Sequence, residues 1–151
     1  MIIDSLTFTL EKSGALDAFW NKLDVGEDGT LGVASSARPF LVASRFAHKP
    51  QATLVVVAGE DAALAFARGV AAYLGDERVM RFPERTDYPF APKKSDATQV
   101  ARRMEAMHAL ATGREVVVVA SARALVRMLP PVGSSVCTPL VLEAGCELGC
   151  M

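Results

Sequence analysis

The chain has 151 residues, of which 51% are hydrophobic, 7% aromatic and 22% charged, and its formal net charge is −1. This length suits one domain with an aliphatic core, and the charge balance argues against a basic surface for nucleic acid, because neutralising phosphates needs clustered Lys and Arg. No apolar run approaches the roughly 20 residues that span a bilayer, and the N-terminus lacks the basic region and apolar core of a signal peptide, so we expect a cytoplasmic protein.

The N-terminal third of the chain predicts a helix, a strand and a second helix. Apolar residues at helical spacing, followed by a glycine, predict a helix over residues 14–23. Residues 30–34 form a short apolar run and are expected to be a strand. A helix is expected over residues 37–47, with Ser35 or Ser36 as its N-cap.

The middle of the chain predicts a strand, a helix and a strand. The continuous β-branched run over residues 53–58 is typical of a strand that is buried on both faces. Acidic residues follow Gly59 and complement the dipole of a helix that is expected over residues 62–74. Residues 78–82 are expected to form the next strand.

The longest predicted helix covers residues 96–111. Its buried stripe is expected to consist of four apolar residues at helical spacing: Val100, Met104, Met107 and Leu110. A second strand buried on both faces is expected over residues 116–120. A helix over residues 122–129 follows and is stopped by two prolines.

This alternation of strands and helices predicts the fold class. Continuous apolar strands separated by helices imply a parallel sheet with helices on both faces, which is a three-layer α/β arrangement. Residues 138–142 are expected to form one further short strand. We therefore expect an α/β unit over residues 1–131, and a linker with the first strand of a small second domain over residues 132–151.

A strand followed by a helix is the setting of a phosphate-binding loop, whose pattern is G-x-x-x-x-G-K-[ST]. Gly32 occupies the first glycine position, but Ala37 stands in place of the second glycine and Arg38 in place of the lysine. Pro39 stands in place of the magnesium ligand and supplies neither a hydroxyl nor an amide donor. The pattern therefore indicates a degenerate phosphate loop, in which only Arg38 retains the ability to attract an anion.

Other chemistry is poorly supported by the sequence. The three cysteines, Cys137, Cys146 and Cys150, fall short of the four ligands of a structural zinc site, and both histidines lie on distant predicted helices. An odd number of cysteines without a secretion signal is typical of reduced thiols in a cytoplasm. The sequence contains no G-x-S-x-G elbow. We expect no catalytic residue, no cofactor and no metal.

Two features are candidates for binding a partner. Arg102 and Arg103 form a basic pair on the longest predicted helix, where a solvated face is favoured over a contact with DNA. Tyr88 and Phe90 lie in an apolar loop that two X-Pro steps stiffen. That loop either packs back on the sheet, which we favour, or is offered to a partner.

Two stretches resemble a known family. The loop over residues 82–90 is similar to the element FP-x-(W)E-x-x-P(Y/F), and residues 116–130 are similar to iVV-s-x-x-AL-x-x-x-P. Both elements are found in the N-terminal module of bacterial transcription-repair coupling factors, which is similar to the first domain of the excinuclease B subunit. The resemblance covers residues 5–143 and implies half of a P-loop helicase-like domain whose nucleotide loop has decayed.

This resemblance also implies a function. The whole factor is an ATP-driven DNA translocase that displaces stalled RNA polymerase and recruits the excinuclease A subunit in nucleotide excision repair. Its motor is expected downstream of residue 151, and this chain is expected to be a non-catalytic scaffold that binds the excinuclease A subunit weakly or not at all. Apolar surface left uncovered is expected to cause self-association. The alternatives are a nucleotide-binding α/β enzyme domain and a free-standing adaptor unrelated to repair.

Overall fold

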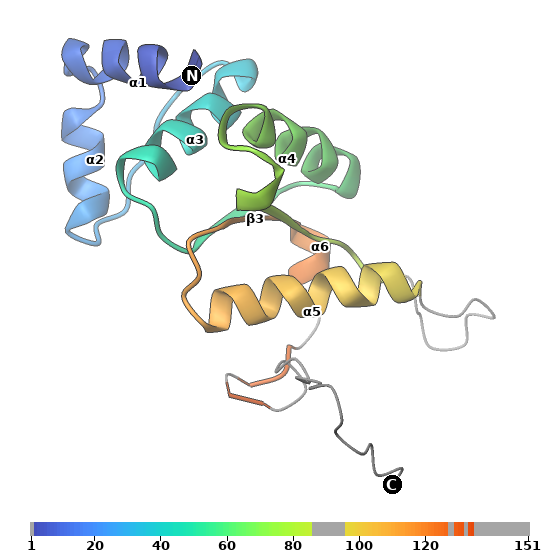
Figure 1. Ribbon diagram of the computed structural model, residues 1–151. Helices are drawn as coiled ribbons and strands as arrows, with labels where there is room; N and C mark the ends of the chain where they lie inside the picture. Colours follow the sequence, from blue (N-terminus) through green and yellow to red (C-terminus); the bar gives the residue numbers. More distant parts are fainter. Residues whose placement is uncertain (1, 86–95, 127–128, 132, 135–151) are drawn as a thin grey trace, which may run out of the picture.

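The computed structural model describes residues 2–85, 96–126, 129–131 and 133–134 (Figure 1). Three of the features expected from sequence lie outside these ranges. They are the aromatic loop with Tyr88 and Phe90, the strand over residues 138–142, and the cysteines.

The centre of the fold is a parallel sheet of three strands in the order β1-β3-β2. Its strands are β1 (Thr53–Val57), β2 (Val79–Phe82) and β3 (Val117–Ser121). In the register of the sheet, Val117 lies opposite Thr53 on one side and opposite Val79 on the other. The parallel α/β class expected from the alternation of strands and helices is therefore confirmed.

Helices cover both faces of this sheet, as Figure 1 shows. One face carries α3 (Arg38–His48) and α4 (Glu60–Leu74), and the other carries α5 (Ala97–Ala111) and the short α6 (Ala122–Leu125). The core on the first face consists of Ala43, Phe46, Ala63, Ala67, Val70, Leu74, Val117 and Val119. The core on the second face consists of Phe82, Ala106, Ala109, Val116, Val118, Ala120 and Ala124.

The N-terminal region differs from the expected one. It contains two helices, α1 (Ile2–Ser13), which was not expected, and α2 (Asp17–Asp24). The strand expected over residues 30–34 is wrong, because these described residues form no strand. Their apolar side chains, Leu31 and Val33, instead line a cavity against α2 and α3. The apolar side chains of this segment pack against helices, and its backbone does not pair with the sheet.

The start of α3 also departs from expectation. Ser35 and Ser36 lie in a 3₁₀ turn, η1 (Ser35–Ala37), and Ala37 is the residue at the N-cap of α3. In this described segment no side chain caps the helix, so the expected serine cap is wrong. Pro39 lies in the first turn of α3, where a missing amide costs no hydrogen bond.

Strand β1 is buried on one face only. Val55 and Val57 pack against the core shared with α3 and α4, whereas Leu54 is 45% exposed and Val56 is 51% exposed. The expectation of burial on both faces is wrong for β1, because this strand lies at an edge of the described sheet. Of the three described strands, only β2 and β3 contribute residues to the core under α5. The same expectation is confirmed for the central strand β3, which is buried throughout.

Helix α5 confirms part of the expected stripe, because Met107 and Leu110 pack against the core, but the helix is rotated so that other residues are its most buried ones. Its buried residues are Arg103, Ala106 and Ala109, while Val100 is exposed. The small side chains of the two alanines let the helix approach the sheet closely. Asp96, expected inside this helix, is its N-cap and accepts a hydrogen bond from the backbone N–H of Thr98 at 2.9 Å.

Candidate functional site

In parallel α/β folds, ligands bind outside the carboxyl ends of the strands. Polar residues gather at this edge here. Glu60 opens α4 just beyond β1, Glu84 follows β2, and Ser121 is the last residue of β3. This edge of the sheet is therefore the candidate ligand-binding site.

The polar groups at this edge bind one another. Arg81 on β2 forms an ion pair with Glu60, whose other carboxylate oxygen accepts a hydrogen bond from the backbone N–H of Glu84 at 3.3 Å. The hydroxyl of Ser121 donates to the Glu84 carboxylate at 2.8 Å and accepts from the backbone N–H of Ala124 at 3.1 Å. One network thus joins the ends of all three described strands.

Arg103 belongs to this edge as well. Its Nη1 donates to the carbonyl oxygen of Pro83 at 2.6 Å and to that of Ala124 at 3.4 Å. Its guanidinium carbon lies 3.9 Å from the centre of the Phe82 ring, an arrangement that attracts the cation to the ring. Arg103 therefore ties the loop after β2 to α6.

The solvated face expected for the basic pair is thus wrong for Arg103, which is only 7% exposed. It is correct for Arg102, which is exposed on the neighbouring face of α5. Adjacent helical residues point about 100° apart, so the two arginines have different surroundings. Ala106 and Ala109 follow Arg103 at spacings of three residues, and this pattern could have predicted from sequence that Arg103 lies on the buried face.

The residues of the predicted degenerate phosphate loop are not among the partners in this network. Gly32 is exposed in a described segment that forms no strand, Ala37 ends the 3₁₀ turn, and Arg38 is exposed at the start of α3. Pro39 packs against Gly69 of α4, where an added Cβ would lie 3.0 Å from both the Cβ and the Cγ of the proline. The residue predicted to stand at the magnesium-ligand position is therefore used for contact between two helices.

A second charged cluster fastens α2 to α3. Asp24 accepts hydrogen bonds from Arg45 and Lys49, each at 2.6 Å. These bonds, that from Arg45 first, hold the pKa of the Asp24 carboxyl far below its ordinary value. Arg45 also lies 5.5 Å from the centre of the Trp20 ring. Trp20 and Arg45 also line an apolar cavity of about 290 Å³ between α2 and α3.

Within the residues that the structure describes, no three His, Cys, Asp or Glu side chains lie together in a way that would hold a metal ion. The same part of the chain contains no helix of the length and apolarity that a membrane span requires. No family model, curated protein or solved structure matches the chain.

Proposed function

We propose that this chain is a non-catalytic scaffold and interaction module of a transcription-repair coupling factor, acting in transcription-coupled nucleotide excision repair. The observation that carries the proposal is the contact between Pro39 and Gly69. A phosphate loop would need a hydroxyl at position 39 to hold magnesium, and here that position packs a proline ring against α4. A fold that has kept the helix and reused its phosphate position for packing fits a scaffold derived from a nucleotide-binding ancestor.

The carboxyl edge of the sheet supports the same proposal. Glu60, Arg81, Glu84 and Ser121 bind one another, and Arg103 binds two carbonyl groups. Such charges are stabilised by their mutual contacts, and releasing them to bind a ligand would leave buried partners unsatisfied. The edge therefore serves best as an internal tie between strands and helices.

The uncovered face of β1 supports an interaction role. Leu54 and Val56 present apolar surface on the side of the sheet that α5 covers only at β2 and β3. Apolar sheet surface of this kind is normally covered by another domain or by a partner protein. We assign this face to contact with other domains of the coupling factor or with a second copy of the chain. We expect no tight binding site for the excinuclease A subunit on this chain.

The first experiment tests for nucleotide binding. We expect the melting temperature of the chain to be the same, within about 1 °C, with and without saturating ATP and Mg²⁺, since binding to the native state would raise it. The Arg38→Ala variant is the matched control. A rise of several degrees that disappears in Arg38→Ala would contradict the proposal and favour the nucleotide-binding enzyme.

The second experiment titrates the chain with the excinuclease A subunit by calorimetry, with a complete coupling factor as the positive control. The complete factor is expected to bind, and this chain is expected to bind at least about 100-fold more weakly, a difference of about 2.7 kcal/mol. Tight binding by this chain alone would refute the assignment of the excinuclease contact to another part of the factor. Co-purification with neither repair nor transcription proteins would favour the free-standing adaptor.

A further inference from the structure

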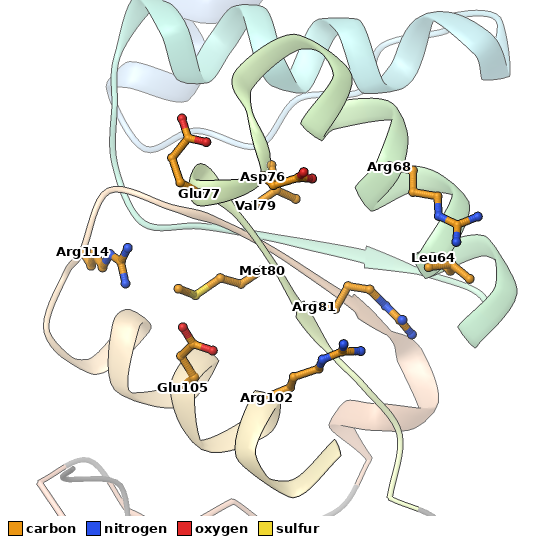
Figure 2. Close-up of a pocket in the computed structure, with 10 residues that line it drawn as sticks. All are labelled: Leu64, Arg68, Asp76, Glu77, Val79, Met80, Arg81, Arg102, Glu105 and Arg114. Carbon is orange, nitrogen blue, oxygen red and sulfur yellow. The ribbon is translucent and has the colours of Figure 1, made fainter. Parts of the chain in front are cut away.

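One edge of the sheet opens into a charged groove. Strand β2 pairs with β3 on one side, and in the described sheet it has no neighbour on the other. Along that free side lies a cavity of about 650 Å³, walled by α4 and α5 (Figure 2). Its lining residues are Leu64, Arg68, Asp76, Glu77, Val79, Met80, Arg81, Arg102, Glu105 and Arg114. We call this cavity the β2 groove.

The charges of the β2 groove are separated along its length. Figure 2 shows the guanidinium groups of Arg68, Arg81 and Arg102 gathered at one end. Glu77, Glu105 and Arg114 lie towards the other end, near the start of β2, where the carboxylates outnumber the cation. An occupant with charges separated in the opposite sense would therefore be attracted in a defined orientation.

The arginine end has unused binding capacity. Arg68 and Arg102 make no hydrogen bond or ion pair with any residue in the described part of the chain. Arg81 pairs with Glu60, but its buried Nε finds no acceptor among the described residues. Guanidinium groups bind carboxylates through two parallel hydrogen bonds, so this end is suited to acidic side chains.

The floor of the β2 groove is suited to a polypeptide backbone. The free side of an edge strand presents unpaired N–H and C=O groups that pair with an added strand. The four residues of β2 correspond to about 13 Å of strand at about 3.3 Å per residue. A short extended segment is long enough to use the whole edge.

We propose that the β2 groove binds an extended, acidic segment of a partner protein, which adds to β2 as a further strand and places its carboxylates over Arg68 and Arg102. A second copy of this chain is less suited, because β2 is recessed between α4 and α5 and the same helices of the copy would meet them first. The inference rests on the groove alone and is independent of the proposed function.

Fluorescence anisotropy with labelled synthetic peptides tests this site. The probes are Thr-Val-Thr-Val-Asp-Glu and its reversed sequence, which allow for both strand directions. We expect one of them to bind the intact chain, and the Lys-Lys version of the same peptide to bind at least about tenfold more weakly. A version with two adjacent prolines is expected to lose binding, because one of the two removes a needed N–H whichever the register.

Charge-reversal variants locate the binding. Arg68→Glu and Arg102→Glu are each expected to weaken binding of the acidic peptide by at least about tenfold, with an unchanged melting temperature, because both side chains are exposed. Arg38→Glu is the matched control, since it makes the same charge change at an exposed arginine outside the groove. It is expected to leave the affinity within about twofold.

Four outcomes would overturn the inference. The first is no binding of either acidic peptide at about 1 mM. The second is an equal loss of affinity in the Arg38→Glu control. The third is undiminished binding of the two-proline peptide, which would indicate charge attraction without strand addition. The fourth is a dimer in sedimentation that Arg102→Glu dissociates, which would make a second copy the occupant.

Discussion

Pro39 and Gly69 are in contact across the interface of α3 and α4. A Cβ built on Gly69 would lie 3.0 Å from both the Cβ and the Cγ of the proline, closer than ordinary van der Waals contact. The side chain of proline is bonded back to its own backbone nitrogen, so the ring cannot rotate away and the clash is relieved only if α3 moves. The absence of a side chain at position 69 therefore sets how closely the two helices approach.

Replacing this glycine tests the contact. In a free helix, Gly→Ala raises helix stability by about 1 kcal/mol. We expect Gly69→Ala to lower the free energy of unfolding by about 1–2 kcal/mol instead, because the added methyl group overpacks the interface. Urea denaturation provides the measurement, with Ala72→Gly on the exposed side of α4 as the reference for propensity alone. Stabilisation by Gly69→Ala would show that α3 and α4 separate freely.

The adjacent arginines of α5 offer a second test with a built-in control. Arg103→Ala removes donors to the carbonyl groups of Pro83 and Ala124 and the contact with the Phe82 ring. We expect a loss of about 3 kcal/mol in the free energy of unfolding, since two buried acceptors are left behind. Arg102→Ala is expected to change it by less than about 0.5 kcal/mol. Similar effects for both variants would contradict the buried role of Arg103.

A third prediction concerns the coupling between Ser121 and Glu84. Ser121 both caps α6 and donates to the carboxylate of Glu84, so Ser121→Ala is expected to cost about 1–2 kcal/mol of unfolding free energy. In a double-mutant cycle with Glu84→Ala we expect a coupling of about 1 kcal/mol, measured by denaturant unfolding. Additive effects of the two substitutions would mean that the hydrogen bond contributes nothing to stability.

The sequence predicts the sheet better than it predicts the surroundings of the sheet. Continuous β-branched runs predicted β1 and β3, because strands with such composition are stabilised by burial wherever they lie. The order of the strands decides which of the two is central, and that order depends on contacts distant in sequence. The exposed face of β1 was therefore not predictable from its own residues.

The network at the carboxyl edge was missed for a related reason. Glu60 and Glu84 are charged, and charged residues are solvated by default, so nothing in their local sequence indicates the contacts that they make at this edge. Their positions after parallel strands were the available signal, since carboxyl ends of such strands meet at one edge. The degenerate phosphate loop stays a prediction: each position of that motif has its own chemical requirement, but the described residues before the turn form no strand.

The fourth prediction concerns pH. Hydrogen bonds from Arg45 and Lys49 lower the pKa of Asp24 in the folded chain below its ordinary value of 3.8. The stability that this difference provides is present above pH 3.8 and is lost as the pH falls towards the lower folded pKa. We expect the free energy of unfolding to fall more steeply below about pH 4 in the wild type than in Asp24→Asn.

Acid titration of urea unfolding curves measures this difference. Lys49→Met serves as the control, because it removes the second bond and keeps the one from Arg45, which is the larger cause of the shift. Its pH dependence is therefore expected to lie closer to that of the wild type than to that of Asp24→Asn. Identical slopes for wild type and Asp24→Asn would show that the cluster does not stabilise the fold.

The last prediction concerns the uncovered face of β1. We expect the chain to self-associate through Leu54 and Val56, and the double variant Leu54→Thr, Val56→Thr to weaken that association at least about tenfold, because threonine retains strand propensity while removing apolar surface. Sedimentation equilibrium over a range of concentrations measures the change. Val25→Thr is the matched control, as it removes an exposed apolar side chain elsewhere. A wild-type chain that stays monomeric, or an equal effect of Val25→Thr, would refute this role for β1.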